Sequence, residues 1–282
     1  MYYYAGNTTN NWVKFAGYYW RIIRTNHDGS IRLLYHGTST TATNAYIGTS
    51  AFNSSYNDIA YVSYMYGSLG SIPNARENTT NSTIKTTIDN WYKINLEAKG
   101  YTKYLSRTAV YCNDRSTSNN ADFGAQTRLY KNKNKTPTYD CATTEDKFTA
   151  DTSTGNGKLD HPIALMTADE VSFAGGLIWK DAPTWYYYNS ANGSSTGDTS
   201  WWLLSPSFWS GSLAYVFYVY GGSVNPGNLN NDNIVYSAKG VRPVISLKSD
   251  VLYKLGDGTA NSPYEIVGGT PSSSGGGNSD NN

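Results

Sequence analysis

Residues 18–36 read YYWRIIRTNHDGSIRLLYH, and this stretch decides the class of fold. Two runs rich in Tyr, Ile and Leu, residues 18–24 and 31–36, flank the dipeptide Asp28-Gly29. Such runs are typical of strands, and Asp-Gly readily takes the positive φ angles of a tight hairpin turn. The stretch therefore predicts an antiparallel β-hairpin with positive φ angles at Asp28 and Gly29.

The composition around the hairpin is typical of a β-rich, loop-rich protein. The 282 residues include 26 Tyr, 8 Trp and 27 Gly, whereas only 15% are charged, against about 25% in an average soluble domain. With 22 Lys and Arg against 21 Asp and Glu, the net charge is +1, so no nucleic-acid partner is expected, because phosphate contacts usually require a basic excess. No apolar run reaches the roughly 18 residues of a membrane span, so none is expected.

A helical pattern follows the hairpin. Residues 37–81 are rich in Thr, Ser, Asn and Gly and predict surface loop, with one short strand near residues 60–65. Residues 82–99 (STIKTTIDNWYKINLEAK) then place Ile84 and Ile88 on one stripe, with a glycine just beyond the end. That spacing predicts a helix packed against the core.

A second, shorter helix is predicted over residues 167–174. Thr167 and Glu170 have the spacing of a capping box, in which each side chain bonds the other's backbone N–H. Gly175-Gly176 follow at once and predict the end of the helix.

Short strands dominate the rest of the chain. The apolar runs are residues 201–205 (WWLLS), 213–220 (LAYVFYVY), 233–236 (NIVY) and 241–247 (VRPVISL). The order of elements predicts an α+β domain over residues 1–267, with mixed or antiparallel sheets, two helices and long loops. Strands at 19–24 and 241–247 are expected in one sheet. The remainder, residues 268–282 (GGTPSSSGGGNSDNN), predicts a flexible tail.

The chain contains two cysteines, Cys112 and Cys141, in polar surroundings. They enclose a Ser-, Asn- and Lys-rich excursion, which favours a disulfide across that excursion over two free thiols. A zinc site is not expected, because two thiols and three scattered histidines supply no ligand cluster.

Six motifs recur in a fixed order and resemble those of a broad family: YWRII (19–23), DNWY (89–92), CNDR (112–115), PIALMTADEV (162–171), WLLSP (202–206) and GVRPVISL (240–247). The chain resembles the bacterial C-type-lectin-like domains of surface and pilin-like proteins, whose hallmark is W-L-x-S-P followed by G-V-R-P. The resemblance extends from about residue 20 to 267 and implies a C-type-lectin-like fold.

Relatives of that fold include the variable proteins of diversity-generating retroelements. In those proteins, adenines in a C-terminal stretch of the gene are mutated. The resemblance therefore implies a ligand-facing surface rich in Asn and in the residues that mutated Asn codons encode, and residues 208–236 are dense in Asn, Tyr and Ser. The same residue types are abundant throughout the chain, so two interpretations stay open: retroelement diversification, and general composition.

Metal and enzyme signatures are missing from the sequence. Calcium-dependent sugar lectins of this fold use Glu-Pro-Asn or Gln-Pro-Asp together with Trp-Asn-Asp, and none of these tripeptides occurs. Residues 151–160 (DTSTGNGKLD) lack the glutamate that closes a calcium loop, so neither a metal nor another cofactor is expected. The formylglycine-generating oxidases of this fold need a close pair of reactive cysteines, whereas Cys112 and Cys141 lie in a polar excursion. We therefore expect a non-enzymatic module; an oxidase-like enzyme and a ligand-free pilus subunit are the alternatives.

The predicted function is adhesive ligand binding at the surface of a cell or pilus, with a protein or glycan on another surface as the partner. Tyr and Trp combined with Ser and Asn are typical of recognition surfaces. We expect the signal or anchor for export to lie outside this sequence, which opens at Met1 without a basic and apolar leader. Strand alternation predicts that about half of the aromatic side chains in residues 214–220 point inward. The predicted contact residues are Trp185, Tyr187, Phe208, Trp209, Ser210, Tyr215, Tyr218, Tyr220, Asn225, Asn228, Asn230 and Tyr236.

Overall fold

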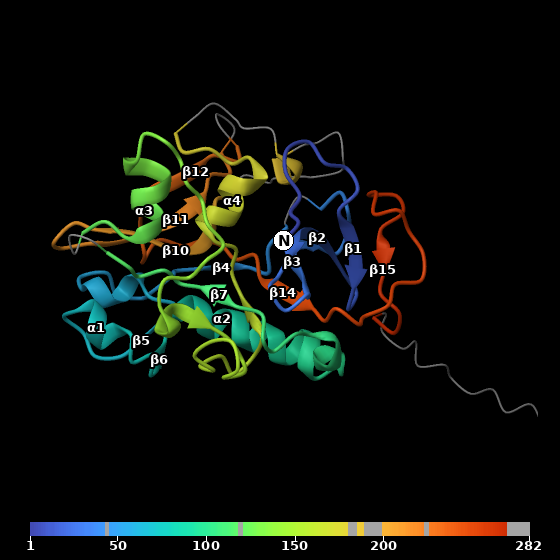
Figure 1. Cartoon of the computed structure of the whole chain (residues 1–282), viewed down its shortest axis with the longest axis horizontal. Coiled ribbons are helices and arrows are strands. Elements are labelled where there is room, and N and C mark those ends of the chain that lie inside the picture. Colours follow the sequence, from blue (N-terminus) through green and yellow to red (C-terminus); the bar gives the residue numbers. More distant parts are fainter. Residues whose placement is uncertain (43–44, 118–120, 180–184, 189–198, 223–225, 270–282) are drawn as a thin grey trace, which may run out of the picture.

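The described part of the chain forms a mixed α+β structure of two larger sheets, two small sheets and short helices (Figure 1). This confirms the predicted α+β class. The structure is a computed structural model that describes residues 1–42, 45–117, 121–179, 185–188, 199–222 and 226–269.

The six-stranded sheet has the predicted hairpin at its centre. Its strand order is β15-β1-β2-β3-β14-β9, and β1 pairs with β15 in parallel while the other neighbours are antiparallel. The predicted strands at 19–24 and 241–247 do lie in this sheet, with β3 between them. The strands are β1 (Trp12–Phe15), β2 (Tyr18–Thr25), β3 (Ile31–Gly37), β9 (Ile163–Ala164), β14 (Val244–Leu247) and β15 (Tyr264–Glu265).

The hairpin turn differs from the prediction. Gly29 has a φ of 79°, whereas Asp28 does not have a positive φ. The Gly29 N–H donates to the Asn26 carbonyl (3.1 Å) and the Asn26 N–H to the Ser30 carbonyl (2.8 Å), so the loop is longer and needs one left-handed residue. The Asp28 carboxylate accepts hydrogen bonds from the Ser30 N–H and from the Ser106 hydroxyl (2.6 Å), which fastens the turn to a distant segment.

The second sheet has the order β12-β11-β10-β13-β4 and contains the C-terminal aromatic strands. Pro206 lies within the long strand β10, where the register with β11 shifts on either side, as expected for a residue that cannot donate to the ladder. The strand predicted at 233–236 begins earlier, at Leu229. The strands are β4 (Thr49–Ser50), β10 (Trp201–Trp209), β11 (Ala214–Val219), β12 (Leu229–Ile234) and β13 (Lys239–Gly240), and the two small sheets pair β5 (Met65–Tyr66) with β6 (Thr80–Asn81) and β7 (Tyr111–Cys112) with β8 (Lys147–Phe148).

Both predicted helices are present. Helix α2 (Thr83–Tyr92) starts at the Ser82 cap and continues as a π-helical turn over Lys93–Glu97, with Ile84 and Ile88 buried. Helix α4 (Ala168–Ala174) has the predicted capping box. The Thr167 hydroxyl accepts from the Glu170 N–H (3.1 Å), and the Glu170 carboxylate accepts from the Thr167 N–H (3.0 Å).

The described residues contain more helix than the two predicted segments. Helix α3 (Gly124–Gln126) lies inside the excursion between Cys112 and Cys141, where Phe123 and Leu129 enter the core. Residues 37–81 are also more than surface loop, since Phe52 and Tyr64 are fully buried. The additional helices are α1 (Ile72–Ala75), α3 (Gly124–Gln126), a π-helical turn (Thr127–Lys131) and 3-10 turns at Ile59–Val62, Tyr101–Tyr104, Thr144–Asp146 and Tyr186–Tyr188.

The predicted disulfide is present. Cys112 and Cys141 are bonded, with 5.7 Å between their Cα atoms and a sequence separation of 29. Cys112 belongs to β7, so the bond ties the end of the excursion to a strand near the core. At the C-terminus, the Gly269 carbonyl accepts from the Ala16 N–H, and the rest of the predicted tail lies outside the described residues.

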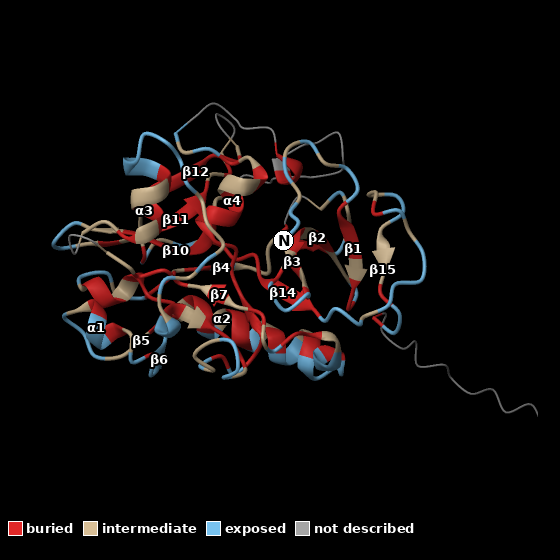
Figure 2. Ribbon diagram, in the orientation of Figure 1, coloured by how far each residue is buried: buried red, intermediate tan, exposed pale blue. Residues whose placement is uncertain are grey.

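Buried hydrophobic residues form a continuous cluster that includes residues from both larger sheets, α2 and α4 (Figure 2). Trp20, Trp185, Trp201 and Trp202 are the largest of its fully buried apolar side chains. Among the described residues, no helix is long and apolar enough to cross a membrane.

Candidate ligand-binding site

The structure divides the predicted contact residues into a buried and an accessible group. Phe208, Trp209, Tyr215 and Tyr220 are half-buried, and Ser210 and Tyr236 are exposed. Asn225 lies outside the described residues. The interior group consists of Trp185, Tyr187, Tyr218, Asn228 and Asn230. These five side chains are buried among neighbouring protein and are not accessible to a ligand in this structure.

The burial of Trp185 and Tyr187 has a specific cause. Tyr187 and Trp201 lie against the guanidinium of Arg242, at 3.9 and 4.8 Å from their ring centroids. The Trp185 indole N–H donates to the Gly227 carbonyl at 3.2 Å. Tyr187 and Trp201 therefore make cation–π contacts with a fully buried arginine, and Trp185 is fixed beside Tyr187 by ring contact and by its own hydrogen bond.

About half of the aromatic side chains of residues 214–220 are buried, as predicted, but they do not alternate: Phe217 and Tyr218 are buried, and Tyr215 and Tyr220 are half-buried. Two consecutive residues are buried because the register between β11 and β12 shifts between Val216 and Tyr218. The sheet also has α3 and α4 on one side and the segment that contains α1 on the other (Figure 1).

Of the accessible aromatic residues that were predicted, Phe208 lines a cleft of about 250 Å³, which we call the Trp179 cleft. Its apolar wall consists of Trp179 (53% exposed), Tyr130 (44% exposed) and the half-buried Phe208. The Phe208 ring stacks on Tyr215 at 4.1 Å and 13°. Polar side chains complete the lining: Asp122, Gln126, Lys131, Asn231 and Asp232.

A chain of amide hydrogen bonds fixes the floor of the Trp179 cleft. The Trp179 indole N–H donates to Asn231 Oδ1 (3.0 Å), and Asn231 Nδ2 donates to Gln126 Oε1 (2.8 Å). The Ser207 hydroxyl donates to the Asn231 carbonyl (2.7 Å). Because Gln126 belongs to α3 and Asn231 to β12, this network holds the indole between two elements far apart in sequence.

Trp179 has a φ of 51°, in the left-handed region that bulky residues rarely adopt. A conformation of this kind costs about 1–3 kcal/mol and persists only where neighbouring contacts enforce it. Such residues cluster at binding and catalytic sites. The strained backbone and the exposed indole together make Trp179 the principal candidate for ligand contact.

Charged groups line the rim of the Trp179 cleft. Lys131 lies 3.6 Å from the Asp122 carboxylate. The Tyr218 hydroxyl donates to the exposed Asp232 (3.1 Å), and burial together with that carboxylate raises the pKa of Tyr218 to about 12. Lys239 lies over the Tyr218 ring at 4.1 Å, and burial lowers the pKa of Lys239 to about 8. The cleft therefore presents carboxylates and amides beside aromatic faces.

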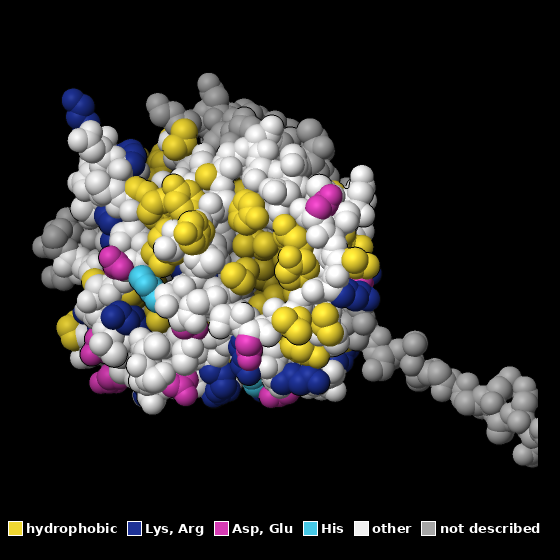
Figure 3. All heavy atoms as spheres, turned by 45° about the vertical axis from the view of Figure 1, so that its right-hand side comes forward, with side chains coloured by type: hydrophobic (Ala, Val, Ile, Leu, Met, Phe, Trp, Pro, Cys, Tyr) yellow, Lys and Arg dark blue, Asp and Glu magenta, His cyan; other side chains and the backbone are white. Residues whose placement is uncertain are grey.

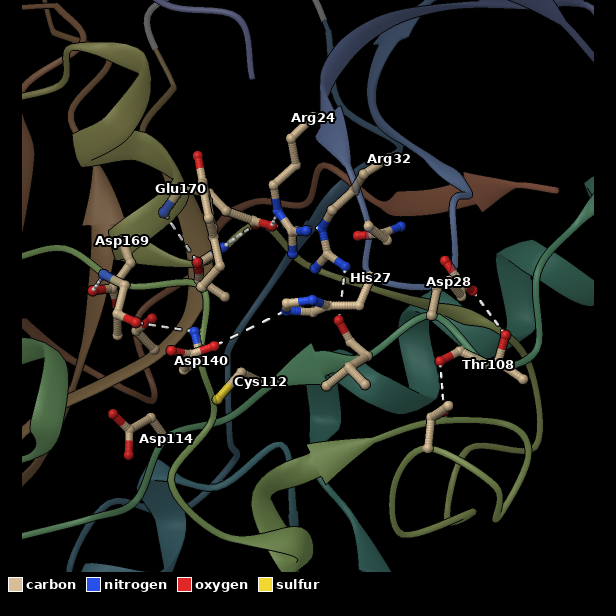
Figure 4. A pocket seen from close by; sticks show the side chains of 18 of the residues that line it. Arg24, His27, Asp28, Arg32, Thr108, Cys112, Asp114, Asp140, Asp169 and Glu170 are labelled. Carbon is tan, nitrogen blue, oxygen red and sulfur yellow. Dashed lines mark hydrogen bonds and ion pairs between the residues drawn. The ribbon is translucent and has the colours of Figure 1, made fainter. Parts of the chain in front are cut away.

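A second cavity, of about 60 Å³, lies between the hairpin, α4 and the disulfide (Figure 4). The Glu170 carboxylate belongs to its lining and lies 2.8 Å from Arg24 Nε and 2.7 Å from Arg32 Nε. Burial opposes ionisation of Glu170, but Arg32 and Arg24 hold its pKa below the ordinary value. Arg128 binds the carboxylates of Asp114 (2.7 Å) and Asp169 (2.9 Å). These ion pairs connect the excursion, α4 and the hairpin.

Neither cavity combines metal ligands. In the parts of the chain that the structure describes, no three His, Cys, Asp or Glu side chains lie together as a metal site. His27 lines the cavity of Figure 4, which we call the charged cavity; its side chain is exposed and lies 4.0 Å from the Asp140 carboxylate. The carboxylates of Asp114, Asp169 and Glu170 are engaged with arginines, so in this structure they act as structural partners.

The sequence prediction missed most of the Trp179 cleft. Phe208 was predicted, whereas Asp122, Gln126, Tyr130 and Trp179 come from segments outside the predicted region. The one available signal was Trp179 itself, an indole a few residues beyond the glycines that end α4.

Searches against protein-family models, curated proteins and solved structures found no match to the chain.

Proposed function

We propose that this chain is an extracellular, non-enzymatic ligand-binding module with a C-type-lectin-like fold, and that it binds a glycan in the Trp179 cleft. The fold assignment is supported by the motif order, the two predicted helices and the hairpin that shares a sheet with the GVRP strand. The disulfide is consistent with an oxidising compartment, such as a cell or pilus surface.

The observation that carries the proposal is the exposed indole of Trp179, strained at φ 51° and hydrogen-bonded to Asn231. The apolar face of a sugar ring packs on an aromatic ring, while its hydroxyl groups bond carboxylates and amides. Asp122 and Asp232 supply carboxylates beside Trp179. The cleft volume, about 250 Å³, is just below the range of small-ligand pockets, which starts at about 300 Å³, so the cleft fits one sugar ring rather than a larger ligand.

A protein partner is the main rival for this cleft, because Tyr and Trp also dominate protein interfaces. We favour a glycan because the site is a concave cleft whose lining combines aromatic rings with carboxylate and amide groups. Retroelement diversification would act on accessible positions of residues 208–236, of which Ser210, Asp232 and Tyr236 are exposed. A reverse-transcriptase gene beside a near-copy of the 3′ end of this gene would support it.

A glycan array probed with the folded, disulfide-bonded protein tests the proposal. We expect selective binding that Trp179→Ala reduces at least tenfold and that Tyr236→Ala leaves within twofold. Tyr236 is among the contacts predicted from the sequence, but it lies outside the cleft lining; as a similarly exposed aromatic residue (50%), it is the matched control for a site confined to the cleft. Equal loss in both variants, or binding that Trp179→Ala leaves unchanged, would contradict the site.

An oxidase-like enzyme is the second candidate, favoured by one observation: Cys112 lines the charged cavity of Figure 4. Aldehyde formation in a cysteine-containing peptide, detected with an aldehyde-reactive probe, would support it over the binding module. Absence of both glycan binding and aldehyde formation would favour the third candidate, a structural pilus subunit without a ligand.

A further inference from the structure

A trough lies on one face of the six-stranded sheet, and its lining residues are remote in sequence from the Trp179 cleft. Its volume is about 510 Å³, within the range of small-ligand pockets. Figure 3 shows hydrophobic side chains gathered around it on the face that includes β1 and β15. We call it the sheet trough.

The floor of the sheet trough is aliphatic. Val13, Ile22, Ile31, Leu247 and Ile266 come from β1, β2, β3, β14 and the end of β15, so the sheet itself sets their spacing. Aliphatic side chains on a sheet face ordinarily pack against a second layer, because water contact is unfavourable for them. Val13, Leu247 and Ile266 are buried, whereas Ile22 and Ile31 are only half-buried, so the trough meets the floor mainly at these two side chains.

Tyrosines form the two walls. The N-terminal segment runs beside β2, with the Thr25 N–H donating to the Tyr2 carbonyl (2.9 Å) and the Tyr4 N–H to the Ile23 carbonyl (3.0 Å). On the opposite wall, Tyr253 contacts Tyr264 edge-on at 5.1 Å. Both walls are thus attached by backbone hydrogen bonds or ring contacts to the sheet.

The charge of the lining has one sign. Arg24 and Lys248 are its ionic groups, and no Asp or Glu is among the lining residues. Arg24 is paired with Glu170, whereas Lys248 is exposed and makes no ion pair within the described part of the chain. Lys248 therefore places a free positive charge at the edge of an aliphatic floor.

We propose that the sheet trough binds a free amphiphilic anion, a long-chain carboxylate whose alkyl chain lies on the aliphatic floor and whose head group pairs with Lys248. The aliphatic floor matches an alkyl chain better than a sugar, which requires more polar partners than this lining offers. We favour an anion over a second copy of the same face, because a copy of this lining would bring no carboxylate to Lys248.

Isothermal titration with sodium dodecanoate below its micelle concentration tests the proposal. Affinity should rise about fourfold for each methylene from octanoate to dodecanoate, as expected when each group leaves water. Dodecyltrimethylammonium should bind about three- to tenfold more weakly than dodecanoate, in line with the modest strength of an exposed ion pair.

Three variants locate the site. Lys248→Glu should weaken dodecanoate binding about three- to tenfold and not weaken dodecyltrimethylammonium, while Lys99→Glu, an exposed charge reversal outside the trough lining, should change neither more than twofold. Ser249→Trp should abolish binding of both amphiphiles by filling the trough, with an unchanged circular-dichroism spectrum and melting temperature as the folding check.

Four results would overturn the proposal. They are no dodecanoate binding, binding that Ser249→Trp leaves unchanged, binding to phosphatidylglycerol vesicles without binding to the monomeric anion, and a dimer in light scattering that excludes dodecanoate. The last two would assign the sheet trough to a membrane surface and to a second copy of the chain. None of these results bears on the Trp179 cleft.

Discussion

Replacing Glu170 with glutamine removes the carboxylate that two buried arginines share, and the chain should lose about 3–5 kcal/mol of unfolding free energy, the usual result of breaking a buried ion pair by removing one partner. Arg24 and Arg32 lie 2.8 and 2.7 Å from the same Glu170 oxygen, and the Glu170 side chain is only 1% exposed. Glutamine keeps an oxygen that can accept from the Thr167 N–H, so Glu170→Gln tests the charge rather than the helix cap.

Thermal unfolding followed by tryptophan fluorescence at pH 7 is the assay. For a chain of this size, roughly 2–3 °C per kcal/mol converts the loss into a decrease in melting temperature of about 6–15 °C. The control is Glu145→Gln at an exposed glutamate with no ion pair in the described residues, which should stay within about 0.5 kcal/mol. A Glu170→Gln melting temperature within 1 °C of the wild type would refute the reasoning.

The pH dependence has a definite sign. Arg32 and Arg24 hold the pKa of folded Glu170 below the ordinary value of 4.5, so its stabilising contribution is complete above pH 4.5 and is lost as pH falls through the folded pKa. The stability difference between wild type and Glu170→Gln should therefore be constant near neutrality and shrink in acid. A difference that grows below pH 4.5 would contradict the assignment.

Three further perturbations have definite expected outcomes. Cys141→Ser should lower the unfolding free energy by roughly 3–4 kcal/mol for a separation of 29 residues, and dithiothreitol should destabilise the wild type but not the variant. Trp202→Ala should cost about 3–5 kcal/mol in urea unfolding because the indole is fully buried, whereas the exposed Tyr236→Ala should stay within about 0.5 kcal/mol. Burial and two nearby buried arginines lower the pKa of His36 well below 6.5, so stability should fall as pH decreases below 6.5, and less steeply in His36→Gln; equal pH slopes would be inconsistent with that burial.

The frame of the fold could be predicted from local sequence patterns. The hairpin, the capping box of Thr167 and Glu170, and the disulfide each depend on residues close in sequence or on a single pair. The turn geometry at Asp28 could not be predicted, because the carboxylate is held by Ser106, far along the chain. Tertiary contact outweighed the local preference of Asp-Gly.

The candidate site was predictable only in part, because side-chain direction depends on what covers each strand. Phe217 and Tyr218 are both buried at a register shift that alternation does not foresee. The Trp179 cleft joins α3 to β12 through Gln126 and Asn231, two residues 105 positions apart. No spacing rule in one sequence brings such residues together, so the composition predicted a recognition surface but not its location.

The indole N–H resonance of Trp179 offers the most direct test of the glycan-binding proposal. In ¹⁵N–¹H spectra of the disulfide-bonded protein titrated with a glycan selected on the array, we expect this resonance to shift saturably, because the indole N–H bonds Asn231 in the floor of the cleft. The indole N–H resonance of the buried Trp20, which donates to the Phe15 carbonyl, should not shift. A glycan that binds while the Trp179 resonance remains unmoved would contradict the account.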